Sequence, residues 1–232
     1  MEGNTTLLSI TQVKKSFLVP GSAETLVVLE DINLDIKAGS LTAIIGPSGS
    51  GKSTLLQIMG ALDRPSSGNV RFKGKEIDSF SDDNLALFRN REIGFVFQGH
   101  YLLPQLSILE NVLLPTMAFS RRFPQHGAES RAKKLLKHMG LGSFENYLPG
   151  QISGGMRQRT ALARALINKP AILLADEPTG SLDQASAASM AEILSSVHVD
   201  EGTALVVVTH SAILASRMQD VYRLENRKLI RE

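Results

Sequence analysis

The chain has no cysteine and no tryptophan among its 232 residues, and its aromatic content is only 5%. The lack of cysteine excludes disulfide bonds and thiolate metal sites, and it is compatible with a cytosolic protein. A net charge of only +2 gives no support for a nucleic-acid-binding surface. Hydrophobic residues at 43% and charged residues at 21% are ordinary values for a globular domain with a sizeable core.

Long hydrophobic runs are also lacking. No stretch approaches the ~20 apolar residues that a membrane-spanning helix needs. Residues 1–6 contain no basic segment, and no apolar segment follows them, so we expect no signal peptide. If the protein works at a membrane, another chain must therefore span the bilayer. The length suits one α/β domain with an inserted subdomain.

Residues 46–54 fit the pattern G-x-x-x-x-G-K-[S/T], preceded by the apolar run Leu41–Ile45 and followed by a helical pattern. The glycines would let backbone N–H groups wrap a phosphate chain at a helix N-terminus. Lys52 would reach the β- and γ-phosphates, and the Ser53 hydroxyl would bind Mg²⁺. The alternative is a plain glycine-rich turn, which the flanking patterns disfavour. The expected nucleotide contacts are Gly46, Pro47, Ser48, Gly49, Ser50, Gly51, Lys52, Ser53 and Thr54.

Strand and helix patterns alternate over most of the chain, as in a phosphate-loop α/β fold. The N-terminal part shows the period-two pattern of half-buried strands, which predicts an antiparallel β subdomain. Expected strands are 7–13, 29–36, 41–45, 69–72, 93–97, 171–175 and 203–209, with a closing hairpin around Asn226-Arg227; expected helices are 54–59, 81–90, 153–168, 184–197 and 211–218. Residues 1–98 and 151–232 would form the nucleotide-binding core.

Residues 99–150 read as a mostly helical insertion in that core. Ser107 and Glu110 have the spacing of a capping box, which predicts the start of a helix. Pro115 should kink or shorten this helix. A second, amphipathic helix over 128–139 should end at Gly140.

Two carboxylates, Asp176 and Glu177, follow an apolar strand. Ligands of open parallel sheets gather at the carboxyl ends of strands, where the phosphate loop also lies. Asp176 would hold Mg²⁺, and Glu177 would orient and deprotonate an attacking water. The alternative is a strand that ends in two solvated acids.

Ser153, Gly154 and Gly155 open a helix and so form a second anion-binding N-terminus in the same chain. One nucleotide cannot easily use both loops of one subunit. A head-to-tail dimer would solve this, with residues 153–155 of one subunit closing on the γ-phosphate held by the other. Taken alone, the segment is equally typical of an ordinary helix cap.

The order of these segments resembles the ATP-binding cassette (ABC) ATPases over essentially the whole chain. The order is phosphate loop, strand-Gln98, Ser-Gly-Gly helix, Asp176-Glu177, residues 181–183 and strand-His210. The Ser-Gly-Gly motif separates that family from other phosphate-loop proteins, although the usual motif begins with Leu and continues Gly-Gly-Gln. Here Ile152 stands in place of that leucine and Met156 in place of that glutamine. Methionine cannot make the hydrogen bonds of the usual glutamine amide.

The resemblance implies roles for four further residues, with ATP and Mg²⁺ as cofactors. Gln98 would contact Mg²⁺ and the attacking water, and would relay nucleotide state into the helical insertion. His210 would contact the γ-phosphate and hold the water beside Glu177. Asp183 would organise the dimer interface, and Phe17 would stack on adenine. Without the family, Gln98 and His210 could simply end strands, and Phe17 could be a core residue.

One branch of the family is similar in detail, namely the ATPases of lipoprotein-releasing and macrolide-exporter-type systems. The similar segments are 19–25, 62–68, 89–98, 102–104 and 110–115. A chain of 232 residues favours the free-standing lipoprotein-releasing type. The branch implies integral membrane subunits, docked around 100–106 and 107–140, and a peripheral place on the cytoplasmic face of the bacterial inner membrane.

Other functions stay open at this point. An exporter of macrolides or peptides, or a cell-division-type membrane actuator, would share every catalytic residue. An ABC protein of DNA repair or translation usually carries a coiled-coil insertion or two cassettes, and this sequence shows neither. A phosphate-loop kinase is disfavoured by Ser153-Gly154-Gly155 and by the lack of an obvious acceptor-substrate domain.

Overall fold

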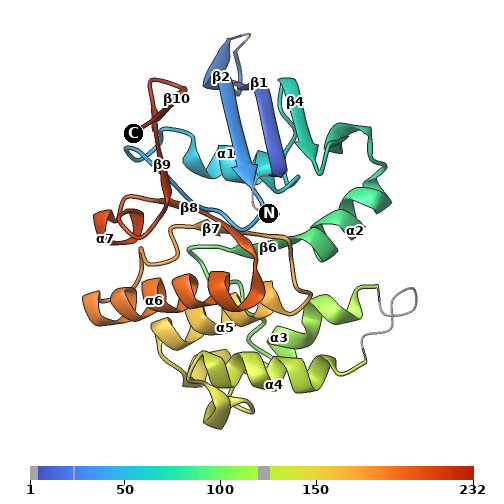
Figure 1. Cartoon of the computed structure of the whole chain (residues 1–232), viewed down its shortest axis with the longest axis vertical. Coiled ribbons are helices and arrows are strands. Elements are labelled where there is room, and N and C mark those ends of the chain that lie inside the picture. The colour runs from blue at the N-terminus through green and yellow to red at the C-terminus, as the bar shows by residue number, and fades with distance from the viewer. Residues whose placement is uncertain (1–4, 23, 120–125) are drawn as a thin grey trace.

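An antiparallel sheet forms one end of the molecule in the computed structural model, which describes residues 5–22, 24–119 and 126–232 (Figure 1). Its strand order is β2-β1-β4-β5, and the predicted β subdomain is confirmed. The first strand is longer than the predicted 7–13, because its pairing with β2 continues to Leu18 through several register shifts that interrupt the period-two pattern. The strands are β1 (Thr6–Leu18), β2 (Thr25–Lys37), β4 (Ser67–Phe72) and β5 (Lys75–Glu76).

A second sheet crosses the middle of the molecule in the order β10-β9-β3-β8-β7-β6. All neighbouring strands in it are parallel except β9 and β10, which form the predicted hairpin. Asn226 and Arg227 both have positive φ, 49° and 67°, as the tight turn of a two-residue hairpin requires. The strands are β3 (Leu41–Ile45), β6 (Ile93–Val96), β7 (Ile172–Asp176), β8 (Ala204–Thr209), β9 (Asp220–Glu225) and β10 (Lys228–Arg231).

Helices cover both faces of the parallel sheet, and α3 and α4 lie at the end farthest from the antiparallel sheet (Figure 1). The capping box of α3 is confirmed, and the helix ends at Met117, two residues after Pro115. Gly140, with φ of 69°, follows the end of α4 as expected. The helices are α1 (Lys52–Met59), α2 (Asp82–Glu92), α3 (Ile108–Met117), α4 (Ala128–His138), α5 (Gly154–Leu166), α6 (Gln184–Glu201) and α7 (Ala212–Ala215), with short 3₁₀ turns at 77–79, 142–144 and 149–151.

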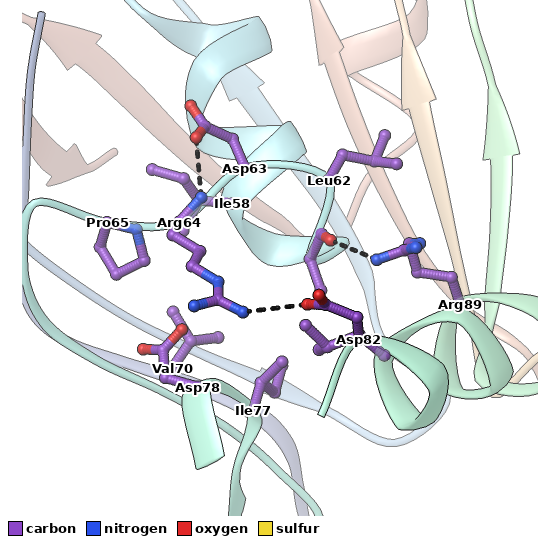
Figure 2. A pocket seen from close by; sticks show the side chains of 12 residues that line it. Ile58, Leu62, Asp63, Arg64, Pro65, Val70, Ile77, Asp78, Asp82 and Arg89 are labelled. Atoms are coloured by element: carbon purple, nitrogen blue, oxygen red, sulfur yellow. Dashed lines mark hydrogen bonds and ion pairs between the residues drawn. The ribbon is translucent and has the colours of Figure 1, made fainter. Parts of the chain in front are cut away.

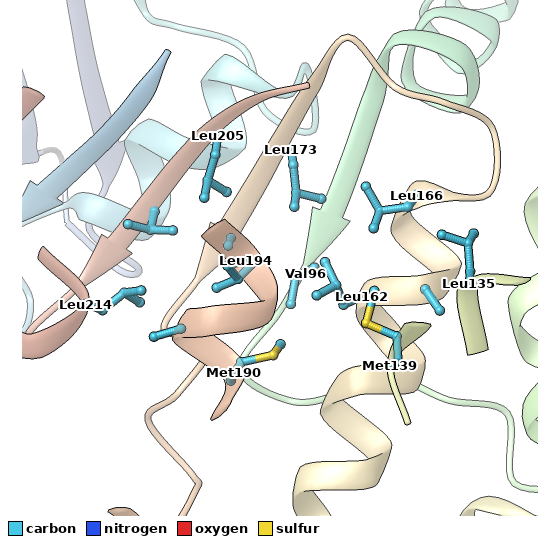
Figure 3. Close-up of a cluster of buried hydrophobic side chains, with 14 of the residues drawn as sticks. Val96, Leu135, Met139, Leu162, Leu166, Leu173, Met190, Leu194, Leu205 and Leu214 are labelled. Atoms are coloured by element: carbon cyan, nitrogen blue, oxygen red, sulfur yellow. The ribbon is translucent and has the colours of Figure 1, made fainter. Parts of the chain in front are cut away.

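The parallel sheet separates two hydrophobic clusters. In β7, Leu173 and Ala175 belong to the cluster shared with α3, α4, α5 and α6, whereas Ile172 and Leu174 belong to the cluster shared with α1, α2 and the antiparallel sheet. Figure 3 shows part of the first cluster, in which Val96 of β6 lies among leucine and methionine side chains of the helices. Burial on both faces explains why these strands read as continuous apolar runs.

Helix α5 joins the helical insertion to the sheet, because it packs against α3 and α4 as well as against β6. The division into a core of residues 1–98 and 151–232 and an insertion of residues 99–150 remains a prediction. Its second boundary falls just before α5, a helix that contacts both parts.

A hollow of about 340 Å³ lies beside the loop that follows α1 (Figure 2). Four charged side chains that line it, Asp63, Arg64, Asp82 and Arg89, are bound to neighbouring groups of the chain. Arg64 reaches Asp82 at 3.5 Å, Arg89 donates to the Ala61 carbonyl at 3.0 Å, and Asp63 accepts from the Arg64 backbone N–H at 2.8 Å. These contacts fix the loop between α1 and β4, and we interpret the hollow as structural.

Candidate functional site

The loop between β3 and α1 passes so close to other backbone that it needs glycine. Gly46 has φ of 156°, and a Cβ there would lie 2.4 Å from the Leu224 carbonyl oxygen of β9. Gly51 precedes α1 with φ of 100°, and its Cβ would lie 2.9 Å from the Val28 side chain of β2. The loop is therefore enclosed by β9 on one side and β2 on the other, with its backbone exposed toward the space between.

Lys52 is buried at the start of α1, where its ammonium donates to the carbonyls of Gly46 at 2.9 Å and Pro47 at 2.8 Å. The charge is thus held at the loop by the loop's own backbone. Among the described residues, the buried Ser50 hydroxyl has no hydrogen-bond partner within the chain. A buried cation, a free hydroxyl and a helix N-terminus together form an environment suited to phosphate oxygens.

A cavity of about 580 Å³ lies beside this loop and brings together Val28 of β2, the phosphate loop with the start of α1, and residues at or just after the carboxyl ends of β6, β7 and β8. Most of the predicted site residues line it, although their separation in sequence exceeds 150 residues. Val28 of β2 also lines the cavity. The sequence patterns did not predict this, because an apolar residue next to a predicted strand carries no sign of a role in a binding site. The predicted residues that line the cavity are Ser48, Gly49, Gly51, Lys52, Ser53, Thr54, Gln98, Asp176, Glu177 and His210.

Asp176 receives a hydrogen bond from the Ser53 hydroxyl at 3.0 Å. Burial raises the pKa of Asp176, and the neighbouring Glu177 carboxylate raises it further, whereas the Ser53 hydrogen bond lowers it. An ionised carboxylate in this position gains from a nearby cation. A hydroxyl, a carboxylate and the Gln98 amide oxygen are the hard oxygen donors that Mg²⁺ prefers, so these residues fit that ion.

This raised pKa has a measurable consequence for stability. Because the folded protein holds the Asp176 proton more tightly than the unfolded chain does, the free energy of unfolding falls as pH rises from the ordinary pKa of aspartate through the raised one. Asp176→Asn removes the charge and keeps an oxygen for Ser53. We expect this variant, free of nucleotide and Mg²⁺, to melt at a higher temperature than the parent at pH 7, in calorimetry.

The same gain should shrink toward zero as the pH is lowered below the ordinary pKa of aspartate, since both proteins are then neutral at this position. Asp35→Asn, at an exposed position of β2, is the matched control and should show no such pH-dependent difference. A gain of equal size at every pH would contradict the assignment of the effect to ionisation.

Glu177 is fixed by contacts from β8 and the residue after it. Its Oε2 accepts from the Thr209 hydroxyl at 3.2 Å and from the His210 backbone N–H at 3.3 Å, and its Oε1 lies 2.9 Å from His210 Nδ1. Its backbone adopts φ of 44°, which is uncommon for a residue other than glycine. Thr209 was missed by the sequence patterns, because it reads there only as the end of an apolar strand.

Eight predicted site residues are not among those that line this cavity. Three of them, Gly46, Pro47 and Ser50, belong to the phosphate loop itself, and the other five lie elsewhere. Phe17 is 43% exposed near the end of β1, with the Lys15 ammonium 4.8 Å from its ring centroid. Ser153 caps α5 by accepting from the Met156 N–H at 3.3 Å. The remaining residues outside the cavity are Gly154, Gly155 and Asp183.

The N-termini of α5 and α6 lie against each other. A Cβ at Gly155 would come within 3.2 Å of the Ser186 hydroxyl, which itself donates to Asp183 at 2.6 Å. Hydrogen bonds from the Ser186 side chain and backbone lower the pKa of Asp183. The predicted partner-facing groups therefore form one surface, separate from the cavity of their own chain.

Known proteins place this arrangement in a family. The sequence profile of the ABC transporter family matches residues 29–180. The lipoprotein-releasing system ATP-binding protein LolD of Myxococcus xanthus is 46% identical over 218 residues, covering 94% of this chain and 96% of that protein. The LolD protein of Bordetella pertussis is 48% identical over 202 residues, covering 87% of each chain.

Solved structures agree with the sequence comparison. A dimeric post-hydrolysis state of the ATP-binding cassette MJ0796 bound to ADP and Pi has a TM-score of 0.88 and 38% identity, and the match covers 97% of this chain and 98% of that one. The CbiO1 protein of Clostridium perfringens, part of an ABC transporter complex, has a TM-score of 0.85 and 26% identity, over 98% of this chain and 88% of that one. The fold and the order of motifs thus lead to one conclusion: the chain belongs to the ABC transporter family.

Proposed function

We propose that the chain is the ATP-hydrolysing subunit of a membrane transporter that releases lipoproteins from the inner membrane of a bacterium. The observation that carries the ATPase part is the cavity in which Lys52, Asp176, Glu177 and His210 meet the phosphate loop. Similarity to LolD proteins over nearly the whole chain supports the lipoprotein-releasing part. Similarity to the MJ0796 cassette, solved in a post-hydrolysis state with ADP and Pi bound, supports hydrolysis.

The phosphate loop and Lys52 would bind the β- and γ-phosphates of ATP. Ser53, Gln98 and Asp176 would hold Mg²⁺, which neutralises charge on the phosphate oxygens when bound. The raised pKa of Asp176 and the oxygen donors around it support this assignment.

Glu177 would accept a proton from the attacking water as general base. The contacts of its carboxylate with Thr209 and His210 orient it toward the cavity rather than toward bulk solvent. His210 is exposed, so its ring can contact the γ-phosphate while it remains beside Glu177.

Two copies would close head to tail around two ATP molecules. The loop residues Ser153, Gly154 and Gly155 and the adjacent Asp183 of one subunit would face the γ-phosphate bound by the other. Their position outside the cavity of their own chain supports this arrangement. The dimeric form of the MJ0796 cassette supports it as well. Phe17 would stack on adenine with its exposed ring face.

Replacing Ser153 by aspartate tests the composite site. Aspartate caps a helix as well as serine does, so α5 should remain stable. Its carboxylate would repel the γ-phosphate held by the partner, so we expect ATP turnover to fall by at least about tenfold. ATP affinity of the monomer should change less than twofold, as measured by calorimetric titration.

Ser81→Asp is the matched control, because Ser81 caps α2 in the same way by accepting from the Asn84 N–H. Its turnover should equal that of the parent protein. A Ser153→Asp variant with full turnover would contradict the head-to-tail arrangement.

The membrane subunits would bind in a groove of about 400 Å³ between α2, β6, α3 and α5. Leu62, Phe95, Phe97 and Pro115 give it apolar walls, which suits a short amphipathic helix of a membrane partner. Among residues 5–22, 24–119 and 126–232, no helix is both long and apolar enough to cross a bilayer. The protein would act as a peripheral subunit on the cytoplasmic face.

Gentle solubilisation of native membranes, followed by isolation of this chain with its bound proteins, tests the transporter assignment. We expect a pair of integral membrane proteins with large periplasmic domains. The isolated complex, placed in proteoliposomes, should release a lipidated protein when ATP is added. A cell-division protein or a drug-efflux partner in place of that pair would contradict lipoprotein release and leave the ATPase chemistry standing.

A further inference from the structure

The loop that follows β6 separates two hollows. Phe97 lines the groove proposed for the membrane partner, and the next residue, Gln98, lines the phosphate cavity. A shift of this loop would therefore change both hollows at once. What holds the loop in place decides how precisely Gln98 is oriented.

Gln158 of α5 holds one part of this loop. Its side chain is almost fully buried, with an exposed fraction of 1%. Its amide Nε2 donates to the Phe97 carbonyl at 3.2 Å, and its Oε1 lies 2.5 Å from His100 Nδ1. Because an amide oxygen can only accept, the His100 ring must donate through Nδ1. The single amide thus binds the loop on both sides of Gln98.

Arg164 of the same helix holds the following residues. Its guanidinium donates to the His100 carbonyl at 2.8 Å and to the Tyr101 carbonyl at 2.6 Å. It also lines the groove, so it lies between the loop and the proposed partner. Together, the two side chains of α5 bind the loop from Phe97 to Tyr101 through four contacts.

The helix that makes these contacts is capped by Ser153, the residue proposed to face the partner's nucleotide. We propose that Gln158 is a positioning residue for ATP hydrolysis, which ties the loop carrying Gln98 to the helix that closes the other site of the dimer. Gln98 of one site and residues 153–155 at the other site would then move as one body. This inference rests on the proposed ATPase function.

Replacing Gln158 by methionine tests the proposal, since methionine has nearly the same length and removes both hydrogen bonds. The Phe97 carbonyl and the His100 ring lose their contact with Gln158, so the loop is held less firmly on both sides of Gln98, while the Arg164 contacts remain. We expect kcat for ATP to fall by about tenfold while KM changes less than twofold. A Gln98→Ala variant should also turn over slowly, and adding Gln158→Met to it should lower kcat by less than twofold more, because Gln158 acts through Gln98.

Thr160→Val is the matched control. Thr160 is buried in the same helix, and its hydroxyl donates only to the Met156 carbonyl at 2.9 Å, away from the loop. It should keep the kcat of the parent and lower the melting temperature about as much as Gln158→Met does. A tenfold loss from Gln158→Met that recurs in full on the Gln98→Ala background would overturn the proposal, because a general loss of packing multiplies in this way.

A second variant keeps the test decisive if Gln158→Met does not fold. His100→Ala removes the same contact from the loop side, at a half-buried position. We expect a threefold lower kcat that disappears on the Gln98→Ala background, and parent-like turnover would overturn the proposal. The activity of the parent protein distinguishes failure of the proposed function from failure of the role of Gln158. If the parent does not hydrolyse ATP, the proposed function is wrong. If the parent and the Gln158→Met variant are equally active, only the role of Gln158 is refuted.

Discussion

Replacing Glu177 by glutamine should lower ATP turnover by at least about a hundredfold, the usual scale for the loss of a general base. The amide has the same shape as the carboxylate and can still accept from the Thr209 hydroxyl and the His210 N–H through its oxygen. It cannot take a proton from water at neutral pH. The variant should therefore bind ATP normally and fail at the chemical step, as single-turnover measurements would show.

The Glu177→Gln variant should accumulate as an ATP-bound dimer, because the closed dimer persists when ATP is not hydrolysed. Size-exclusion chromatography with and without ATP would detect the shift from one to two copies. Glu225→Gln, at an exposed position at the end of β9, is the control and should behave as the parent. Normal turnover by Glu177→Gln would show that another group acts as the base.

Lys52→Met is expected to weaken nucleotide binding strongly. Hydrogen bonds to a charged group contribute roughly 1.5–3 kcal/mol each, and about 1.4 kcal/mol corresponds to a tenfold change in affinity. Loss of the buried ammonium should therefore weaken ATP binding by about a hundredfold or more. Calorimetric titration in buffer with Mg²⁺ measures this directly, independently of turnover.

Lys52 also donates to the carbonyls of Gly46 and Pro47, so part of the loss could come from a disordered loop. Circular dichroism and the melting temperature of the nucleotide-free variant separate the two causes. Lys37→Met, which removes an exposed charge at the end of β2, should leave ATP affinity unchanged. Tight ATP binding by Lys52→Met would contradict the phosphate-binding role assigned to this side chain.

Local signals in the sequence were enough to predict much of the fold. The apolar run Leu41–Ile45 is a strand with those same bounds, and the Ser107–Glu110 pair is the capping box of α3. The hairpin at Asn226-Arg227 follows from two short apolar segments on either side of these residues. In each case the deciding interaction lies within a few residues along the chain, which is why a pattern could reveal it.

The site was only partly predictable for the opposite reason. Thr209 and Val28 contribute to the cavity through contacts between strands distant in sequence, and neither differs in type from its neighbours in a strand pattern. Gln158 looks like one more polar residue in a helix, yet it is buried and binds the loop around Gln98. Such roles depend on tertiary register, which periodicity does not encode.

The carbonyl of Leu224 lies directly against Gly46, so β9 packs against the phosphate loop. This strand follows the loop by almost 180 residues and is therefore synthesised much later. His210 and Thr209 also come from the last part of the chain. Because translation adds residues from the N-terminus, the loop emerges early and remains without this contact until β9 has left the ribosome. A nascent chain that stops short of β9 would carry the full phosphate-binding motif without the strand against which its loop packs.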